Sequence, residues 1–253
     1  MVSGSAPLQA RLARTFAAAG MPIMEGYGLT ETSPVISVND VRNKTFKIGT
    51  VGKLIDNVSI KIAEDGEILV KGPNVMMGYY KDEDKTNDVL SNGFFHTGDK
   101  GEVDDEGFLK ITGRKKEMFK TSGGKYIIPN LLEDKLKQSR FIEQVMIVGE
   151  GEKMPAAIIQ PNFEFIKDWV KRKNIDLKND QSAIVQSDII IKRIQREVDT
   201  CNTHFGKWEQ IKRFELTPDI WSIDDGHLTP TMKMKRKVIK AMYQNLIDKI
   251  YKA

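Results

Sequence analysis

The fold of this chain is decided by residues 58–72, which read VSIKIAEDGEILVKG. Apolar and polar residues alternate from Val58 to Ile62, the pattern of a β-strand with one buried face. Asp65 and Gly66 then supply a hairpin turn, after which the alternation resumes. The segment therefore predicts an antiparallel hairpin in a β-rich region.

A second hairpin is predicted further along the chain. The strand patterns of residues 94–103 and 108–112 flank an acidic turn cluster at residues 104–107. Between the two hairpins, residues 82–90 begin with an aspartate that can cap a helix, so we expect a short helix there. The amino-terminal part of the chain is thus predicted to be rich in hairpins.

The pattern changes after Gly113, where a charged stretch leads into alternating helices and strands. We predict a boundary near Lys116, which gives one domain at residues 1–115 and a second at residues 116–253. The second domain is expected to alternate helices (129–139, 163–173, 188–204) with strands (144–149, 155–160, 211–216). Its last helix would carry one apolar stripe: Val238, Met242, Leu246 and Ile250. The fold class is therefore α/β with mixed α+β character.

Composition excludes several classes of protein. The chain has 253 residues, of which 40% are hydrophobic and 29% charged, so it has room for about two cored domains and is too apolar to be disordered. No run of about 18 apolar residues could span a membrane and no signal-peptide pattern is visible, which predicts a cytoplasmic protein. The net charge of +4 comes with no recognition motif, so we expect no nucleic-acid partner. Cys201 and His204 are too few ligands to predict a zinc site.

Five short segments contain residues that suit phosphate or nucleotide chemistry: 26–32 (GYGLTET), 66–72 (GEILVKG), 95–99 (FHTGD), 113–133 and 228–236 (LTPTMKMKR). In the first, a hydroxyl and a carboxylate follow two glycines and could meet phosphate oxygens and a magnesium ion. Asp99, after a glycine at a strand end, could accept both hydroxyls of a ribose, and Arg114 suits ribose or phosphate. Each segment alone is better explained as a turn, a strand, a linker or a helix start.

Together, in this order and at these separations, the five segments resemble the adenylate-forming superfamily of acyl-CoA synthetases, luciferases and peptide-synthetase adenylation domains. The resemblance covers nearly the whole chain. It implies the β-hairpin-rich end of a large adenylation domain followed by a small mobile α+β carboxy-terminal domain. It also implies a two-step ligase, in which a carboxylate attacks the α-phosphate of ATP to give an acyl adenylate and pyrophosphate, and a thiol then displaces AMP. The expected cofactors are ATP or AMP, Mg²⁺ and coenzyme A.

The resemblance assigns roles to residues in the first domain. Thr30 and Glu31 would act near the phosphates, with Glu31 as the metal ligand. Four residues would bind the nucleotide, the last two of them through the ribose: Tyr27, Gly28, Asp99 and Arg114.

In the second domain, Lys233 aligns with the lysine that bridges negative charge developing on the α-phosphate and the carboxylate. The family pattern has glycine before this lysine, whereas this chain has methionine, so Lys235 stays open as an alternative. Lys116 corresponds to the hinge about which the small domain turns between the half-reactions. Gly123 and Gly124 correspond to the face that meets coenzyme A.

The segment from Leu228 to Thr231 resembles the long-chain fatty acyl branch, which implies the substrates fatty acid, ATP and CoA. Two alternatives stay open: a non-catalytic AMP-binding fragment, and another acyl- or aryl-CoA ligase of the superfamily. The family's phosphate loop would lie upstream of residue 1, so we expect the amino-terminal part of the same enzyme to be missing and the truncated chain to be inactive alone. Peripheral membrane contact stays open for an enzyme that handles lipids, although no amphipathic anchor stands out.

Overall fold

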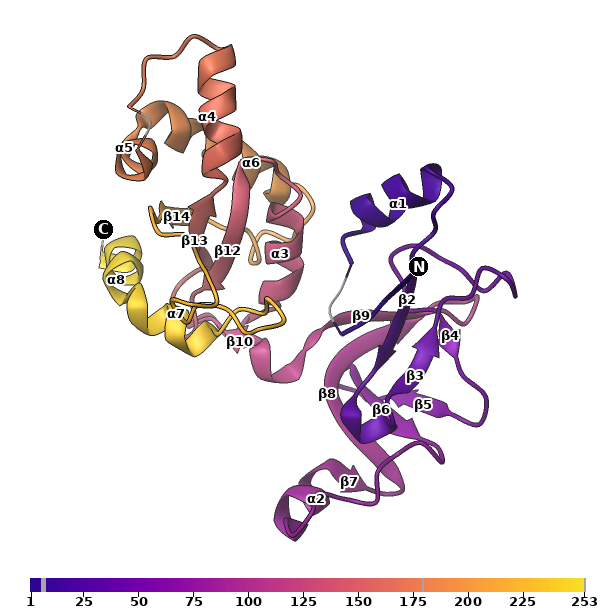
Figure 1. Cartoon of the computed structure of the whole chain (residues 1–253). Coiled ribbons are helices and arrows are strands. Elements are labelled where there is room, and N and C mark those ends of the chain that lie inside the picture. Colours follow the sequence, from indigo (N-terminus) through magenta and orange to yellow (C-terminus); the bar gives the residue numbers. More distant parts are fainter. Residues whose placement is uncertain (6–7, 179, 253) are drawn as a thin grey trace. The chain divides into compact units, whose positions relative to one another are not determined.

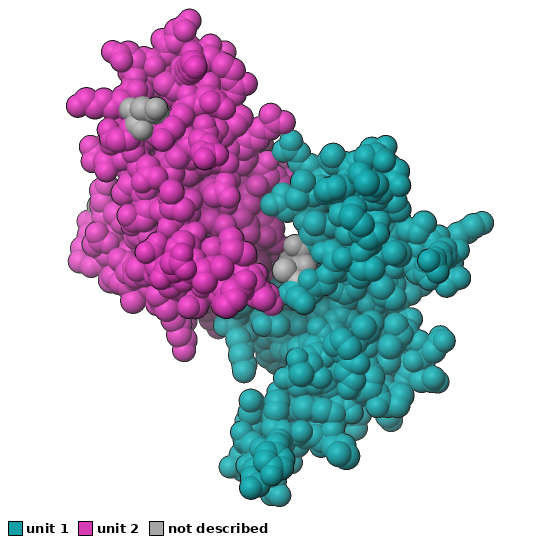
Figure 2. Space-filling view, in the orientation of Figure 1, with its two compact units in different colours: residues 1–117 teal, residues 118–253 magenta. Residues whose placement is uncertain are grey.

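The computed structural model of the chain describes residues 1–5, 8–178 and 180–252. The chain divides into two compact units, Met1–Glu117 and Met118–Ala253, which are coloured separately in Figure 2. The division therefore falls after Glu117, close to the boundary predicted near Lys116.

Unit 1 consists mainly of two β-sheets (Figure 1). The first has the strand order β1-β2-β3-β4, and the second has the order β5-β6-β8-β7 with β9 also paired to β8. Its elements, with their bounds, are β1 (Val2–Ser3), α1 (Ala10–Ala18), β2 (Met24–Gly28), η1 (Thr30–Thr32), β3 (Val35–Val38), β4 (Lys53–Leu54), β5 (Ser59–Ile62), β6 (Glu67–Lys71), α2 (Glu83–Val89), β7 (Leu90–Ser91), β8 (Phe94–Val103), β9 (Leu109–Arg114) and η2 (Lys115–Glu117).

Both predicted hairpins are present in unit 1. Strands β5 and β6 pair antiparallel, with Gly66 in the turn at φ 85°, a conformation that favours glycine. Strands β8 and β9 form the second hairpin around the acidic turn. The alternation of β6 buries Ile68 and Val70 completely, and they pack with Ile36 and Leu109 in the core of this unit.

Unit 2 contains a short two-stranded sheet and a three-stranded sheet with helices on its faces. Its elements are β10 (Phe119–Lys120), β11 (Tyr126–Ile127), α3 (Pro129–Leu136), β12 (Ile142–Val148), β13 (Ala156–Pro161), α4 (Phe163–Arg172), α5 (Gln181–Gln186), α6 (Asp188–Asn202), β14 (Arg213–Leu216), α7 (Arg236–Met242) and α8 (Gln244–Lys252). The sheet has the order β12-β13-β14, antiparallel between the first two strands and parallel between the last two.

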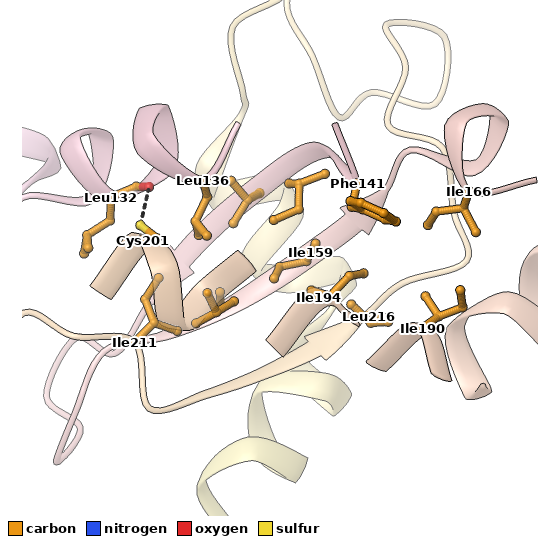
Figure 3. Packing of buried hydrophobic residues seen from close by; sticks show 14 of the residues in the cluster. Leu132, Leu136, Phe141, Ile159, Ile166, Ile190, Ile194, Cys201, Ile211 and Leu216 are labelled. Carbon is orange, nitrogen blue, oxygen red and sulfur yellow. Dashed lines mark hydrogen bonds between the residues drawn. The ribbon is translucent and has the colours of Figure 1, made fainter. Parts of the chain in front are cut away.

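The sheet of unit 2 separates two apolar clusters. Along β13, Ala157 and Ile159 face a cluster formed with α3, α4 and α6, part of which is drawn in Figure 3. Ala156 and Ile158 face the opposite cluster, formed with α7 and α8. Side chains alternate between the two faces of a strand, so a strand covered on both faces is buried throughout, as β13 is.

The carboxy-terminal helix differs from the prediction in two respects. It is broken at Tyr243 into α7 and α8, and the buried stripe contains Ile239, Tyr243 and Ile247. Val238 and Met242, predicted to lie on the buried stripe, are 40% and 49% exposed. Ile250, the last residue of the predicted stripe, is buried as expected, so the contact with the sheet moves the buried face by one residue in α7 and keeps Ile250 on it in α8.

Cys201 belongs to the core that Figure 3 shows, where its Sγ lies 4.0 Å from the carbonyl oxygen of Leu132. Burial raises the pKa of this thiol to about 11. Within the described residues no three His, Cys, Asp or Glu side chains are grouped as a metal site would require. Nor does any described helix combine the length and apolar character needed to cross a bilayer.

Candidate functional site

Three of the predicted nucleotide-binding residues meet at Asp99 in unit 1. Asp99 is 5% exposed and is the ladder partner of Arg114 across β8 and β9. Its Oδ1 accepts a hydrogen bond from Arg114 Nε at 2.8 Å, and its Oδ2 accepts one from Tyr27 Oη, also at 2.8 Å. A carboxylate has about four acceptor positions, so both oxygens can still accept from a ligand hydroxyl.

Asp99 lies inside β8 at a bulge, rather than at the strand end that the sequence predicted. The ladder pairs Glu67 with Lys100 and Leu69 with His96, so β8 has two more residues than β6 over this stretch. A bulge bends the strand and changes the direction of its side chains. The direction in which the Asp99 carboxylate points is therefore determined by this bulge in the sheet.

The bulge explains the sequence Thr97-Gly98-Asp99. Gly98 has φ 71°, in the left-handed region where glycine is favoured. Thr97 Oγ1 donates to the carbonyl oxygen of Ile68 at 2.8 Å and accepts from the backbone N–H of Asp99 at 3.1 Å. The threonine thus satisfies backbone groups on both sides of the irregular ladder.

Electrostatics keep the tyrosine and the arginine of this cluster each in one protonation state near neutral pH. Burial, and after it the charge of Asp99, raise the pKa of the Tyr27 hydroxyl. The hydrogen bond to Asp99 raises the pKa of the Arg114 guanidinium. Tyr27 therefore remains a neutral donor and Arg114 remains a cation.

The loop after β2 is held by contacts between its own residues. A Cβ atom at Gly28 would lie 1.6 Å from the carbonyl oxygen of Pro34, so glycine is required there by close backbone packing. Thr32 is fully buried, and its Oγ1 donates to the carbonyl oxygen of Pro34 at 2.7 Å. Thr30, the first residue of η1, is exposed.

Glu31 is oriented by the segment that follows β6. Tyr79 Oη donates to Glu31 Oε1 at 2.8 Å, and the backbone N–H of Met76 donates to the Glu31 carbonyl oxygen at 2.8 Å. Burial, and after it the bond to Glu31, raise the pKa of Tyr79 to about 12, so this phenol remains a donor. One carboxylate suits Mg²⁺ that also binds phosphates and water, because Mg²⁺ often takes only one or two protein carboxylates.

In unit 2, Lys233 lies in a tight loop closed by a bridge between Leu228 and Met234. The backbone N–H of Thr229 donates to the Lys233 carbonyl oxygen at 2.8 Å, and the Lys233 N–H donates to Thr229 Oγ1 at 3.0 Å. Met232 has φ 62°, in the left-handed region that favours glycine. The side chain of Lys233 is exposed.

The end of this loop is tied to α3. Arg236 begins α7, and its guanidinium binds the buried Glu133 and Asn130 Oδ1, the latter at 2.7 Å. Glu133 Oε1 also accepts the backbone N–H of Ile147 at 2.7 Å. Lys235, at the N-cap of α7, donates its backbone N–H to the His227 carbonyl oxygen at 2.9 Å. The loop is thus anchored at its carboxy-terminal side.

Lys116 and the two predicted CoA-binding glycines lie close to the division between the units. Lys116 is the exposed middle residue of η2. Gly123 and Gly124 are exposed in the turn that joins β10 and β11. Gly124 has φ 77°, and its N–H donates to the Thr121 carbonyl oxygen at 2.9 Å.

Comparison with known proteins identifies the family. The family described as AMP-binding enzyme matches residues 1–80, and the family described as AMP-binding enzyme C-terminal domain matches residues 117–253, more than half of the chain. The chain belongs to the AMP-binding enzymes.

Among these AMP-binding enzymes, curated relatives extend over nearly the whole chain. The long-chain-fatty-acid–CoA ligase FadD15 of Mycobacterium tuberculosis is 40% identical over 250 residues, which are 99% of this chain and 41% of the ligase. Human long-chain-fatty-acid–CoA ligase 1 is 35% identical over 99% of this chain and 38% of its own length. The chain therefore spans about two fifths of the length of these relatives.

Solved structures of AMP-binding enzymes share the fold. The o-succinylbenzoate CoA synthetase of Bacillus subtilis, in complex with an acyl-adenylate intermediate, matches with a TM-score of 0.72 at 24% identity over 94% of this chain and 45% of its own. The adenylation domain of a carboxylate reductase from Mycobacterium chelonae matches with a TM-score of 0.77 at 19% identity, over 100% of this chain and 38% of its own.

Sequence reasoning missed two residues that contact the predicted site of this AMP-binding enzyme. Tyr79 binds Glu31 from 48 positions away, and Glu67 binds the backbone of Gly98 from 31 positions away. Glu67 lies in one of the five segments, but the strand pattern there was explained by the hairpin alone. No local sequence pattern could have predicted either contact, because the two residues that form it lie in different elements of the chain.

Proposed function

We propose that this chain is the carboxy-terminal part of an AMP-forming long-chain fatty acyl-CoA ligase. The observation that carries the proposal is the buried Asp99 held between Tyr27 and Arg114, in a chain 40% identical to a long-chain-fatty-acid–CoA ligase over 99% of its length. The proposed reaction joins a fatty acid to CoA at the expense of ATP, with AMP and pyrophosphate as the other products.

Unit 1 would bind the nucleotide. Asp99 would accept hydrogen bonds from the ribose hydroxyls, while Arg114 holds the carboxylate from one side and can reach ribose or phosphate oxygens with its remaining N–H groups. Tyr27 and Gly28 would border the nucleotide on β2. Because Asp99 is already fixed by two donors, little side-chain freedom is lost when the ribose binds.

The loop at residues 30–31 would face the phosphates. Thr30 offers an exposed hydroxyl, and Glu31 offers a carboxylate whose orientation is set by Tyr79. Bound Mg²⁺ would neutralise charge on the phosphates of ATP. The protein's own contribution here is the placement of one carboxylate and one hydroxyl on a loop held by Thr32.

Lys233 would act in the adenylation step. A carboxylate oxygen of the fatty acid attacks the α-phosphorus of ATP, and the bond from that phosphorus to the bridging oxygen breaks, so pyrophosphate leaves with the electron pair. Negative charge develops between the attacking carboxylate and the α-phosphate, where the ammonium of Lys233 would stabilise it. The glycine-like backbone at Met232 favours Lys233 over Lys235 for this role.

The second half-reaction would follow a turn of unit 2 about the hinge at Lys116. The sulfur of CoA attacks the carbonyl carbon of the acyl adenylate, its proton is lost, and AMP leaves with the electron pair of the broken carbon–oxygen bond. Gly123 and Gly124, exposed in their turn, would let the CoA chain pass close to the backbone.

The test is a complete ligase that contains this chain, supplied with ATP, Mg²⁺, palmitate and CoA. Wild type should release pyrophosphate and form palmitoyl-CoA, and Asp99→Ala should raise the KM for ATP. Glu102→Gln, which removes an exposed pair with Lys110 on the same two strands, should behave as wild type. Absence of pyrophosphate release by the complete wild-type protein would refute the ligase assignment. The isolated chain is expected to be inactive, and rapid turnover by it would contradict that expectation.

A second candidate function is AMP binding by this chain without catalysis. The observation that favours it is that Tyr27, Gly28, Asp99 and Arg114 all lie in unit 1. Calorimetry of the isolated chain with AMP should then give saturable heat that disappears in Asp99→Ala. A wild-type chain that produces no binding heat would exclude this candidate.

A further inference from the structure

Glu67, the first residue of β6, is a buried carboxylate surrounded by donors. Its side chain is 6% exposed. Oε1 accepts the backbone N–H of Gly98 at 2.9 Å, and Oε2 accepts Lys115 Nζ at 2.8 Å and lies 3.3 Å from His96 Nδ1. None of the roles proposed above uses this residue. Burying a carboxylate costs hydration free energy, so its place in a strand calls for a physical reason.

Two of the three residues whose hydrogen bonds the Glu67 carboxylate accepts flank the proposed ribose-binding pair. Gly98 directly precedes Asp99, and Lys115 directly follows Arg114. The Glu67 carboxylate therefore binds both the backbone next to Asp99 and the side chain next to Arg114. The pair itself is joined by the bond from Arg114 Nε to Asp99 Oδ1.

The bulge in β8 explains why an acceptor is needed at this position. A bulge leaves backbone groups without their ladder partners, and a buried N–H without an acceptor costs free energy. The N–H of Asp99 is satisfied by Thr97, whereas the N–H of Gly98 is satisfied by Glu67. Loss of the Glu67 carboxylate would therefore free the backbone that directs Asp99.

Lys115, which follows Arg114 in the chain, forms ion pairs with two carboxylates. Its Nζ lies 2.8 Å from Asp65 Oδ2 and 2.8 Å from Glu67 Oε2. Burial alone would raise the pKa of Glu67, but the hydrogen bonds from Lys115, Gly98 and His96 outweigh it and lower that pKa. The carboxylate is thus ionised at neutral pH and can hold both partners.

We propose that Glu67 is a positioning residue for nucleotide binding, which fixes Asp99 through Gly98 and Arg114 through Lys115. The identity of the ligand rests on the proposed ligase function. The positioning itself rests only on contacts within unit 1. Glu67 acts through its neighbours, so its removal should weaken the interaction with the nucleotide and leave the interaction with the fatty acid unchanged.

The first test compares two glutamine variants in the complete ligase. Glutamine keeps one acceptor oxygen, so in Glu67→Gln either Gly98 or Lys115 loses its partner. This variant should raise the KM for ATP about tenfold and leave the KM for the fatty acid unchanged. Glu102→Gln, the control on the same sheet, should change neither. If Glu67→Gln lowered only kcat, as a smaller folded fraction would, the proposal would be overturned.

The second test needs no ligase activity, so it separates a failure of this proposal from a failure of the proposed function. Nuclear magnetic resonance of the chain would follow exchange of the Arg114 Nε–H, which donates to Asp99. This exchange should be about tenfold faster in Glu67→Gln and in Lys115→Met, and unchanged in Glu102→Gln. Lys115 is half exposed, so Lys115→Met is expected to fold even if the Glu67 variant does not. Unchanged exchange in Lys115→Met would count against the proposal.

Discussion

Arg236 binds Glu133 across 103 positions of the chain, and this ion pair joins the first residue of α7 to the buried face of α3. The side chain of Glu133 is 3% exposed and also accepts the N–H of Ile147. The loop that carries Lys233 ends at this pair. Its position therefore depends on a contact inside unit 2 and not on the loop sequence alone.

Replacing Glu133 should destabilise unit 2 strongly. Glu133→Ala leaves the Arg236 guanidinium without its carboxylate, although its bond to Asn130 remains, and leaves the Ile147 N–H without its acceptor. We expect a loss of about 3–5 kcal/mol in the free energy of unfolding. Urea titration followed by tryptophan fluorescence measures this, because all three tryptophans lie in unit 2. Glu215→Gln, which removes a partly exposed pair with Lys249, should cost less than about 1 kcal/mol. Similar costs for both variants would argue against the importance of the buried pair.

Lys233→Ala and Lys235→Ala distinguish the two candidate lysines. In the complete ligase, Lys233→Ala should slow adenylation by about 10²–10³-fold, because the charge that stabilises the transition state is lost. Lys235→Ala should have little effect. Both variants should still convert supplied acyl adenylate to acyl-CoA. Pyrophosphate release measures the first step, and the reverse order of the two effects would move the assignment to Lys235.

Replacing Met232 with glycine should stabilise the protein. Its φ of 62° is unfavourable for a residue with a Cβ atom, so Met232→Gly should raise the free energy of unfolding by up to about 1 kcal/mol. Met232→Val should lower it, because a β-branched residue tolerates this region least. The same fluorescence titration compares the two variants. If valine were as stable as glycine, the left-handed conformation would not be what the loop requires.

Lys116→Pro tests the hinge. Proline fixes φ and removes the N–H at the exposed middle residue of η2, so rotation about this position should be blocked. In the complete ligase we expect pyrophosphate release to persist while acyl-CoA formation falls by about an order of magnitude. Lys116→Ala should leave both steps intact. Normal acyl-CoA formation by the proline variant would place the hinge elsewhere.

Acid should weaken unit 1 through Glu67. The folded-state pKa of Glu67 is lowered from its ordinary value of 4.5, so its contribution to stability is full above that value and is lost as the pH falls through the folded-state pKa. The free energy of unfolding of unit 1 should therefore drop below pH 4.5 in wild type and drop less in Glu67→Gln. Methyl signals of Ile68 in urea at several pH values would follow this transition. Parallel curves for the two proteins would contradict the prediction.

Local sequence patterns predicted much of the fold. The alternation around Asp65 and Gly66 gave a correct hairpin, and the helix predicted at residues 163–173 is observed at Phe163–Arg172. The stripe predicted for the last helix was correct at Ile250 and wrong at Val238, because helical spacing allows several faces and packing against the sheet buried Ile239 instead. The sequence did not predict the short strand β3, because a strand of four residues is too short to show a clear alternation of apolar and polar side chains.

The sequence by itself determined the family, the order of the elements and the residue types available to a nucleotide, because these follow from neighbouring residues and from motif order. Only the tertiary structure decided which of those residues meet. It brought Tyr27 and Arg114 within hydrogen-bond distance of the two carboxylate oxygens of Asp99. It also brought the Glu67 carboxylate to the backbone N–H of Gly98 in the bulge. The physical reason is that a hydrogen bond between elements far apart in the chain depends on register and packing, which no local pattern encodes.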